Sequence, residues 1–198
     1  MKKIILLLAF IPIISFSQTK KTKVLLSEIE GQWKLDENNC LFYQEIVELP
    51  GLDKSSLFQR AENYFIYTYS SGKDVIQTKD KETGIIIGKG YWYDLFTGVS
   101  IGSFNYSASH ILRIDAKDGK ARITLTVKDY HIHWEGDNMV RDYDNPINSI
   151  YPINYESSVK NWDAKVFYSI HYKCKKIIEE LSRNLKDDAV KSAGSDNW

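Results

Sequence analysis

Residues 110–128 read HILRIDAKDGKARITLTVK, and this stretch decides the fold more strongly than any other part of the chain. Asp118-Gly119 stands between two runs that alternate apolar and polar residues, a pattern typical of a two-residue type I′ hairpin turn. Counting outward from this turn, Ile114 faces Ile123 on an apolar face, and the opposite face is polar. A shift of one residue would place every apolar side chain in water, so the sequence specifies the hairpin register strongly.

A strand, a helix and a second hairpin are predicted upstream. Residues 41–49 are rich in aromatic and β-favouring side chains and stop at Pro50-Gly51, which predicts a strand followed by a turn. Apolar residues then recur every three or four positions over 56–69, the spacing of an amphipathic helix. Residues 74–79 and 84–94 predict two further strands joined as a hairpin.

Downstream of the central hairpin, the apolar residues of 158–185 step by threes and fours, which predicts a long amphipathic helix. The order is therefore strand, helix, four strands and long helix. Strands followed by a covering helix favour an α+β fold with a single antiparallel sheet of about five strands and helices on one face. Because the sequence contains no repeat and no linker, we expect one domain over residues 24–185. A flexible segment at 18–23 would precede it, and a disordered tail at 186–198 would follow it.

The first 17 residues have the pattern of a signal peptide. Lys2 and Lys3 precede an apolar stretch at 4–14, and the small residues Ser15 and Ser17 suit cleavage after Ser17. The stretch is about half the roughly 20 apolar residues that a membrane-spanning helix needs. We therefore expect an exported protein, periplasmic or secreted, with no transmembrane segment after cleavage.

Composition narrows the class of partner. The 26 lysine and arginine residues balance 26 aspartate and glutamate residues, and 43% of the chain is hydrophobic, as in an ordinary folded domain. Without a basic excess the chain gains little from releasing counterions from a phosphate backbone, so no nucleic-acid partner is expected.

The chain has two cysteines, Cys40 and Cys174. Export would permit a disulfide between them, but the Cα atoms must then lie within about 7 Å, and nothing in the sequence brings them together. Cys174 falls on the apolar stripe of the long helix, where a thiol packs as a small hydrophobe. We predict two free thiols.

Three motifs together resemble a known family. They are VELPGLDK at 47–54 leading into LFQRA at 57–61, DVIQ at 74–77 with DKETGIIIGKG at 80–90, and RIDAKDGKAR at 113–122. Over roughly residues 33–126 the chain resembles exported bacterial proteins grouped as domain of unknown function 4468, with a fold like that of the TATA-box-binding protein (TBP). The resemblance implies the element order derived above and supplies no catalytic residues. A shared sheet with a DNA-binding protein implies nothing about DNA, because function resides in sites.

A hydrolase motif occurs at residues 98–102, where GVSIG matches the G-x-S-x-G pattern of serine hydrolases. That motif places its serine on a sharp turn between a strand and a helix, whereas residues 103–115 predict a strand. As a nucleophile, Ser100 would also need a histidine within hydrogen-bond reach. A serine hydrolase that uses Ser100 is therefore a minor alternative.

Metal and cofactor motifs are incomplete. His131 and His133 would share one face of a strand, as half of a zinc site does, but exposed strand histidines are the simpler interpretation. Acidic residues at 135–138 and 142–145 carry oxygen ligands suited to Ca²⁺ without the spacing of an EF-hand. Gly88-Lys89-Gly90 lacks the rest of a dinucleotide fingerprint. We predict no metal, no cofactor and no catalytic residues.

The aromatic segment around Tyr91, Tyr93 and Phe96 is the predicted binding site. It ends a strand before a glycine-containing loop and would offer an exposed stacking surface for a sugar or a protein partner, unless alternate rings fill the core. We thus expect a non-catalytic binding or interaction module of the cell envelope, whose partner is an envelope protein or a small ligand. The alternative is a carrier of small apolar ligands with a cavity between the sheet and the C-terminal helix.

Overall fold

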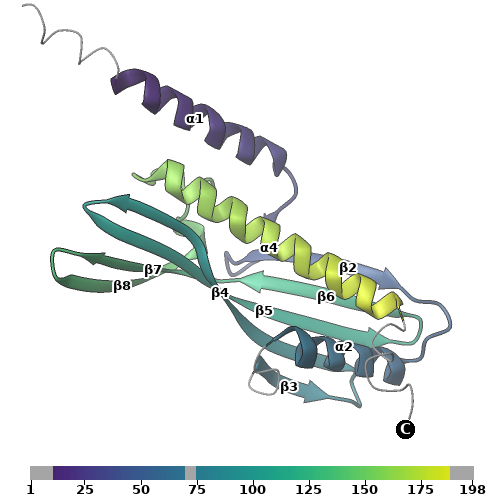
Figure 1. Ribbon diagram of the computed structural model, residues 1–198. Coiled ribbons are helices and arrows are strands. Elements are labelled where there is room, and N and C mark those ends of the chain that lie inside the picture. The colour runs from purple at the N-terminus through teal and green to yellow at the C-terminus, as the bar shows by residue number, and fades with distance from the viewer. Residues whose placement is uncertain (1–10, 70–74, 188–198) are drawn as a thin grey trace, which may run out of the picture.

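The computed structural model of the protein describes residues 11–69 and 75–187, which form an antiparallel sheet with helices on one face (Figure 1). In chain order the elements are α1 (Ile11–Glu28), β1 (Lys34–Leu35), β2 (Leu41–Glu48), α2 (Lys54–Thr68), β3 (Ile76–Asp80), β4 (Ile85–Ser100), β5 (Gly102–Lys117), β6 (Lys120–Val127), β7 (Asp129–Gly136), β8 (Met139–Pro146), the 3₁₀ helix η1 (Ile147–Ser149) and α4 (Lys160–Lys186). The α+β class is as predicted.

The central hairpin has the predicted register. Ile114 pairs with Ile123 and Leu112 with Leu125 across β5 and β6, and all four side chains are fully buried. Gly119 in the turn has a φ of 75°, a backbone conformation that glycine adopts without strain. The polar face of this hairpin points away from the helices.

The sheet has eight strands, so the predicted number of about five is wrong. β1 is a two-residue strand beside β2, and β7 and β8 form a hairpin of which only a strand at His131 and His133 was predicted. The extra strands exist because β4 and β5 are each 16 residues long and extend well beyond β6. Where β6 ends, β7 pairs with the first half of β5 in its place.

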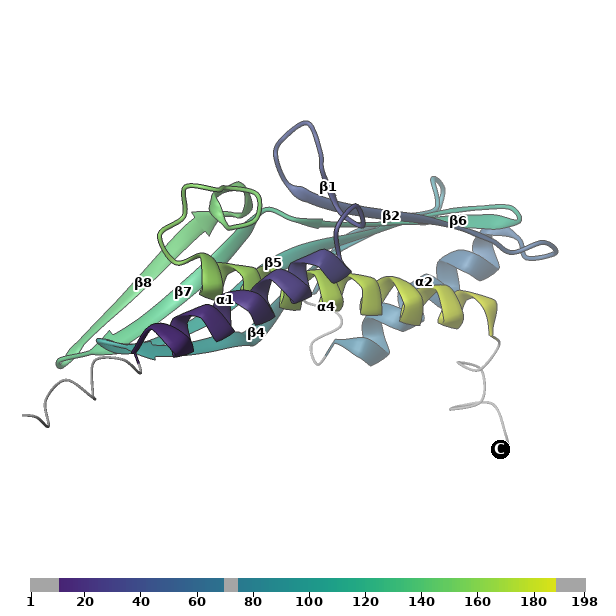
Figure 2. The ribbon, with the colours of Figure 1, turned by 90° about the horizontal axis from the view of Figure 1, so that it is seen from above.

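The sheet consequently has two parts. The body has the strand order β1-β2-β6-β5-β4-β3. The arm, defined as residues 96–108 of the β4–β5 hairpin together with β7 and β8, has the order β4-β5-β7-β8. Figures 1 and 2 show the arm projecting to the left of the body, with β8 along its outer edge.

Helices α2 and α4 lie side by side over one face of the body. The Arg60 guanidinium of α2 donates to the backbone carbonyl of Leu185 in α4, at 2.7 Å. The side of α4 that faces the sheet is filled with fully buried side chains, among them Phe167, Ile170 and Leu181. Burial of this stripe is the main contribution of α4 to stability.

The N-terminal segment differs from the prediction. Residues 18–23, expected to be flexible, belong to α1, which lies beside α4 (Figure 2). At the end of α1 the Glu28 carboxylate accepts a hydrogen bond from the Tyr168 hydroxyl of α4 at 3.1 Å, and the next residue, Ile29, is buried. Residues 1–10 of the predicted signal peptide, and 188–198 of the predicted tail, lie outside the described residues.

Candidate functional site

The predicted aromatic site is divided between the two faces of the sheet. The rings of Tyr91 and Tyr93 are 40% and 73% exposed on the face without helices, with centroids 4.6 Å apart. Phe96 instead lies toward α4, with its ring centroid 6.1 Å from that of Trp162 and 5.1 Å from Lys165 Nζ. Two of the three predicted residues therefore share an exposed surface.

Alternation along β4 causes this division, and a β-bulge between the tyrosines and Phe96 leaves it unchanged. Between Trp92, which pairs with Ala108, and Phe96, which pairs with Tyr106, β4 has additional residues without direct partners. Asp94 in this bulge has a φ of 53°, and its carboxylate accepts a hydrogen bond from the Asn105 side chain. Three residues of β4 lie here opposite one residue of β5, so Trp92 and Phe96 keep the same, helix-covered face.

Behind the two tyrosines the sheet is rigidly packed. Trp92, between them in sequence, is buried on the helix side, where it stacks on His110. The Tyr69 hydroxyl lies 2.9 Å from Nε2 of His110. Burial lowers the pKa of His110 to about 4, so this imidazole is neutral near pH 7.

On the arm, the face of the sheet that no helix covers carries polar side chains. As predicted, His131 and His133 share one face of β7, and the register places Asp144 and Asp142 of β8 directly opposite them. Nδ1 of His131 lies 2.9 Å from Oδ1 of Asp144, and its Nε2 lies 3.2 Å from Oδ1 of Asp142. Nδ1 of His133 lies 2.8 Å from the same Asp142 oxygen.

These contacts shift the pKa values of the cluster. The hydrogen bond with Asp144 is the main reason that the pKa of His131 is raised, and it outweighs partial burial, which lowers it. The hydrogen bond with His133 holds the pKa of Asp142 below its usual range. The sequence shows the two histidines and the acidic residues of 142–145, but only the strand register pairs them.

The metal hypotheses gain no geometric support. Across 11–69 and 75–187, no group of three or more His, Cys, Asp or Glu side chains is arranged to hold a metal ion. Asp137 and Asn138 form the β7–β8 turn, with positive φ values, and residues 142–145 are part of β8. The acidic residues considered for Ca²⁺ therefore lie along a hairpin and do not surround a common point.

Ser100 is at the tip of the β4–β5 hairpin, not between a strand and a helix. The histidine side chains hydrogen-bond elsewhere: His110 to Tyr69, His171 to Tyr43, and His131 and His133 to Asp142. The surroundings that a nucleophilic serine requires are thus missing. The flanking glycine Gly98 has a structural role, because a Cβ there would lie 3.1 Å from the Trp162 ring.

Gly88 and Gly90 also have packing roles inside β4. A Cβ on Gly88 would lie 2.3 Å from the Phe65 ring of α2, so the missing side chain allows the helix to approach the sheet. The resemblance to a dinucleotide loop is therefore a consequence of close helix packing.

The carrier hypothesis requires an enclosed apolar cavity beneath α4, and the packing described above fills that space. The depressions found beside α4 are open to solvent. One of about 510 Å³ lies between the end of α1 and α4 and is lined largely by polar side chains, including Glu28, His171, Lys175 and Glu179. An open depression with charged residues in its lining is not the enclosed cavity that the carrier hypothesis requires.

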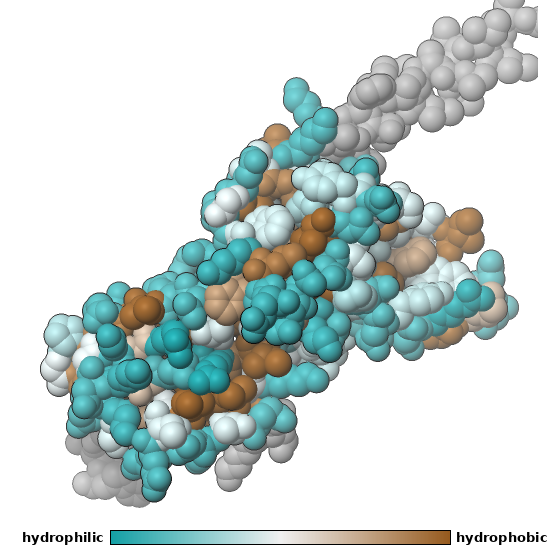
Figure 3. Space-filling view, turned by 180° about the vertical axis from the view of Figure 1, so that it is seen from behind, coloured by the Kyte–Doolittle hydropathy of each residue, from teal (hydrophilic) through white to brown (hydrophobic). Residues whose placement is uncertain are grey.

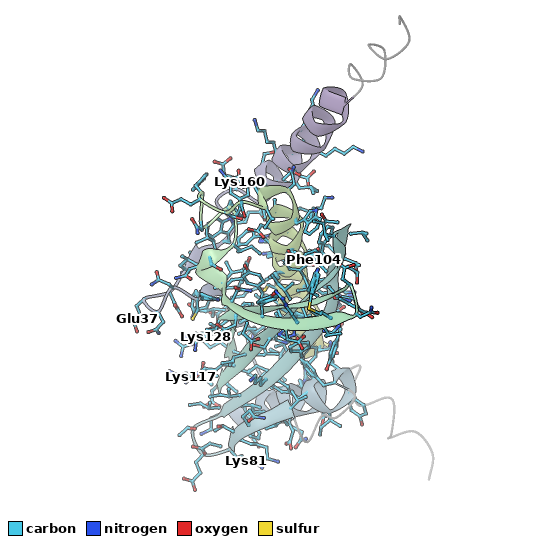
Figure 4. The ribbon with its side chains drawn as sticks, turned by 90° about the vertical axis from the view of Figure 1, so that its left-hand side faces the viewer. Glu37, Lys81, Phe104, Lys117, Lys128 and Lys160 are labelled. Atoms are coloured by element: carbon cyan, nitrogen blue, oxygen red, sulfur yellow. The ribbon has the colours of Figure 1, made fainter. Side chains whose placement is uncertain are left out.

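The two arm hairpins expose apolar residues at their tips. Val99 and Ile101 are 77% and 78% exposed, and Met139 and Val140 lie at the neighbouring tip. In Figure 3 hydrophobic residues are visible at the end of the arm, on the right, within a largely hydrophilic surface. On the helix side, Phe104 fills the space between the arm and α4 (Figure 4), with its ring centroid 5.2 Å from that of Trp162.

Comparison with known proteins agrees with this architecture. Residues 43–131 match the model of the family described as domain of unknown function (DUF4468) with TBP-like fold. A DUF4468 family protein from Bacteroides ovatus ATCC 8483 superposes with a TM-score of 0.60 at 12% identity, covering 80% of this chain and 92% of the other. A TBP-like protein from Parabacteroides distasonis ATCC 8503 gives a TM-score of 0.57 at 13% identity, covering 78% and 97%.

At such low identity the two solved structures show a common fold and nothing about ligands. No curated protein matches the chain. Within the described part of the chain, none of the helices combines the length and apolar character needed to cross a bilayer.

Proposed function

We propose that the chain, whose residues 43–131 match the DUF4468 family model with a TBP-like fold, is a non-catalytic binding module of the cell envelope. The proposed binding surface is the face of the sheet without helices where the body meets the arm. Its partner is an envelope protein or a small ligand. Residues 1–17 are proposed to direct export and to be removed afterwards.

The exposure of Tyr91 and Tyr93 is the observation that carries this proposal. Two large rings in contact with each other stand on an uncovered face, where each loses little conformational entropy on binding because it has only two rotatable side-chain bonds. Tyrosine is enriched at interfaces since it combines apolar area with a hydroxyl that finds a polar partner. The pair therefore has the character of a binding anchor.

The surroundings of the pair support the same conclusion. Asp94 and Asn105, joined by a side-chain hydrogen bond next to the tyrosines, provide polar groups beside the apolar rings. The stacked rings of Trp92 and His110 support the surface from below. A rigid backing lowers the entropic cost of binding.

A nucleic-acid partner is not part of the proposal. On the uncovered face of the body, the Asp115 carboxylate accepts hydrogen bonds from Arg113 at 2.6 Å and from Arg122 at 3.2 Å. Binding to phosphates requires an excess of cations, and the 26 basic residues of the chain are balanced by 26 acidic residues.

Site-specific crosslinking in the native host tests the proposal. A photoreactive phenylalanine analogue would replace Tyr93, and a control protein would carry it at Tyr172, which is also exposed but lies on α4. We expect a discrete adduct from position 93 that is reduced about tenfold by Tyr91→Ala. Adducts of equal yield and mass from both positions, or no adduct from position 93, would refute a binding surface at the tyrosines.

A further inference from the structure

β8 is an edge strand whose outer side is open. Within the described residues it pairs with β7 and with no other strand. Seven of its eight residues are exposed, and only Asn145 is half-buried. An edge of this kind presents backbone N–H and C=O groups that another strand can pair with.

The side chains of β8 differ between its two faces. Asp142 and Asp144, two positions apart, point to the uncovered face of the arm, where the neighbouring side chain Glu135 of β7 adds a further carboxylate at the level of Val140. Arg141 and Tyr143 point to the opposite face. The register places no lysine or arginine of the arm on the acidic face, and its cationic contribution comes from His131 and His133 alone.

This distribution of charge opposes pairing with a second copy. In a continuous sheet formed by two copies around a two-fold axis, opposite residues of antiparallel strands must point to the same face. Asp142 of one copy would then lie opposite Asp142 or Asp144 of the other copy. In a third register it would lie opposite Val140. The first two arrangements place like charges opposite each other, which is destabilising.

We infer that the free edge of β8 docks an extended segment of another protein that carries lysine or arginine at alternate positions. Backbone pairing along β8 would bind the segment, and its cations would face Asp142 and Asp144. Residues between the cations would reach the opposite face, beside the exposed ring of Tyr143. Eight strand residues span about 27 Å, so the segment has about eight residues.

This surface is separate from the proposed tyrosine site. β8 is the last strand of the arm, and β5 and β7 lie between it and β4, which carries Tyr91 and Tyr93. The inference therefore holds or fails independently of the proposed function.

A synthetic peptide of about eight residues that alternates lysine and threonine tests the inference. Two matched peptides accompany it, one with glutamate in place of lysine and one with N-methylated backbone amides, which cannot pair as a strand. Binding would be followed by fluorescence anisotropy, and the site would be located by amide chemical-shift changes. We expect the lysine peptide to bind about tenfold more tightly than either matched peptide, with shifts concentrated in 139–146.

Charge variants decide whether the carboxylates of β8 are responsible. The double substitution Asp142→Asn and Asp144→Asn should weaken binding about tenfold, whereas Glu37→Gln with Glu82→Gln removes the same charge from distant turns and should leave it unchanged. Equal binding by the N-methylated peptide would mean unspecific charge attraction and overturn the inference. So would equal weakening by both pairs of substitutions, or a dimer that forms through β8 without peptide.

Discussion

The indole ring of Trp92 stacks on the imidazole of His110, with ring centroids 4.0 Å apart and an interplanar angle of 16°. The stack lies inside the molecule, between α2 and the sheet, while the residues on either side of Trp92 in the chain are the exposed tyrosines. The position of the proposed binding surface thus depends on the packing beneath it.

Gly90 should be essential for this stack. A Cβ at position 90 would lie 2.4 Å from Cε1 of His110 and 2.7 Å from the Tyr69 ring, so Gly90→Ala should destabilise the fold by about 1–3 kcal/mol. Urea denaturation would measure the loss. The neighbouring exposed substitution Lys89→Ala should cost less than about 0.5 kcal/mol, and an unchanged midpoint for Gly90→Ala would contradict the described packing.

The register of the central hairpin can be tested by paired substitutions. Leu125→Ala should cost about 2–5 kcal/mol because its side chain is fully buried, and Thr124→Ala on the opposite face should cost less than about 0.5 kcal/mol. Denaturant midpoints provide the comparison. Equal losses at both positions would show that the register is wrong.

The pKa of His131 should depend on Asp144. Because the hydrogen bond with Asp144 raises the folded-state pKa above the unfolded value of about 6.5, the stability contributed by this contact is complete below that value and is lost as pH rises through the folded pKa. Asp144→Asn should move the pKa of His131 back toward its ordinary value. Glu135, His133 and Asp142 line the same face and remain in the variant.

An NMR titration of the imidazole resonances would measure this shift. The same titration of Glu82→Gln serves as the control, since Glu82 lies in the β3–β4 turn. A pKa of His131 that is the same with and without Asp144 would contradict the described contact.

Both cysteines should be free and unreactive in the folded protein. Cys40 and Cys174 are buried thiols, and burial raises the pKa of each above its usual range, which keeps the reactive thiolate scarce. Alkylation without reductant should add no group to the native protein and two groups after denaturation. A mass that increases only after reduction would reveal a disulfide.

The mature protein should begin at Gln18 after export by its native host. N-terminal sequencing of the exported protein measures this directly. A retained Met1 would refute the signal peptide.

The sequence predicts those helices and strands whose buried residues recur at a regular spacing. The strand at 41–49, the helix at 56–69 and the long C-terminal helix were all predicted within a few residues of their observed bounds. β8 was missed because nearly all of its side chains are exposed, so its sequence carries no apolar alternation. α1 was not predicted because the polar residues 18–23 give no sign of the contact with α4, in which Tyr168 binds Glu28.

By itself, the sequence determined the α+β class and the central register, because a hairpin with alternating apolar residues can bury them all in only one register. Only the tertiary structure decided which aromatic residues are exposed. Alternation along β4 separates Tyr91 and Tyr93 from Phe96, but only the packing of the helices on the sheet settles which of the two faces is covered. The pairing of His131 with Asp144 likewise depends on the register of two exposed strands, which no burial pattern encodes.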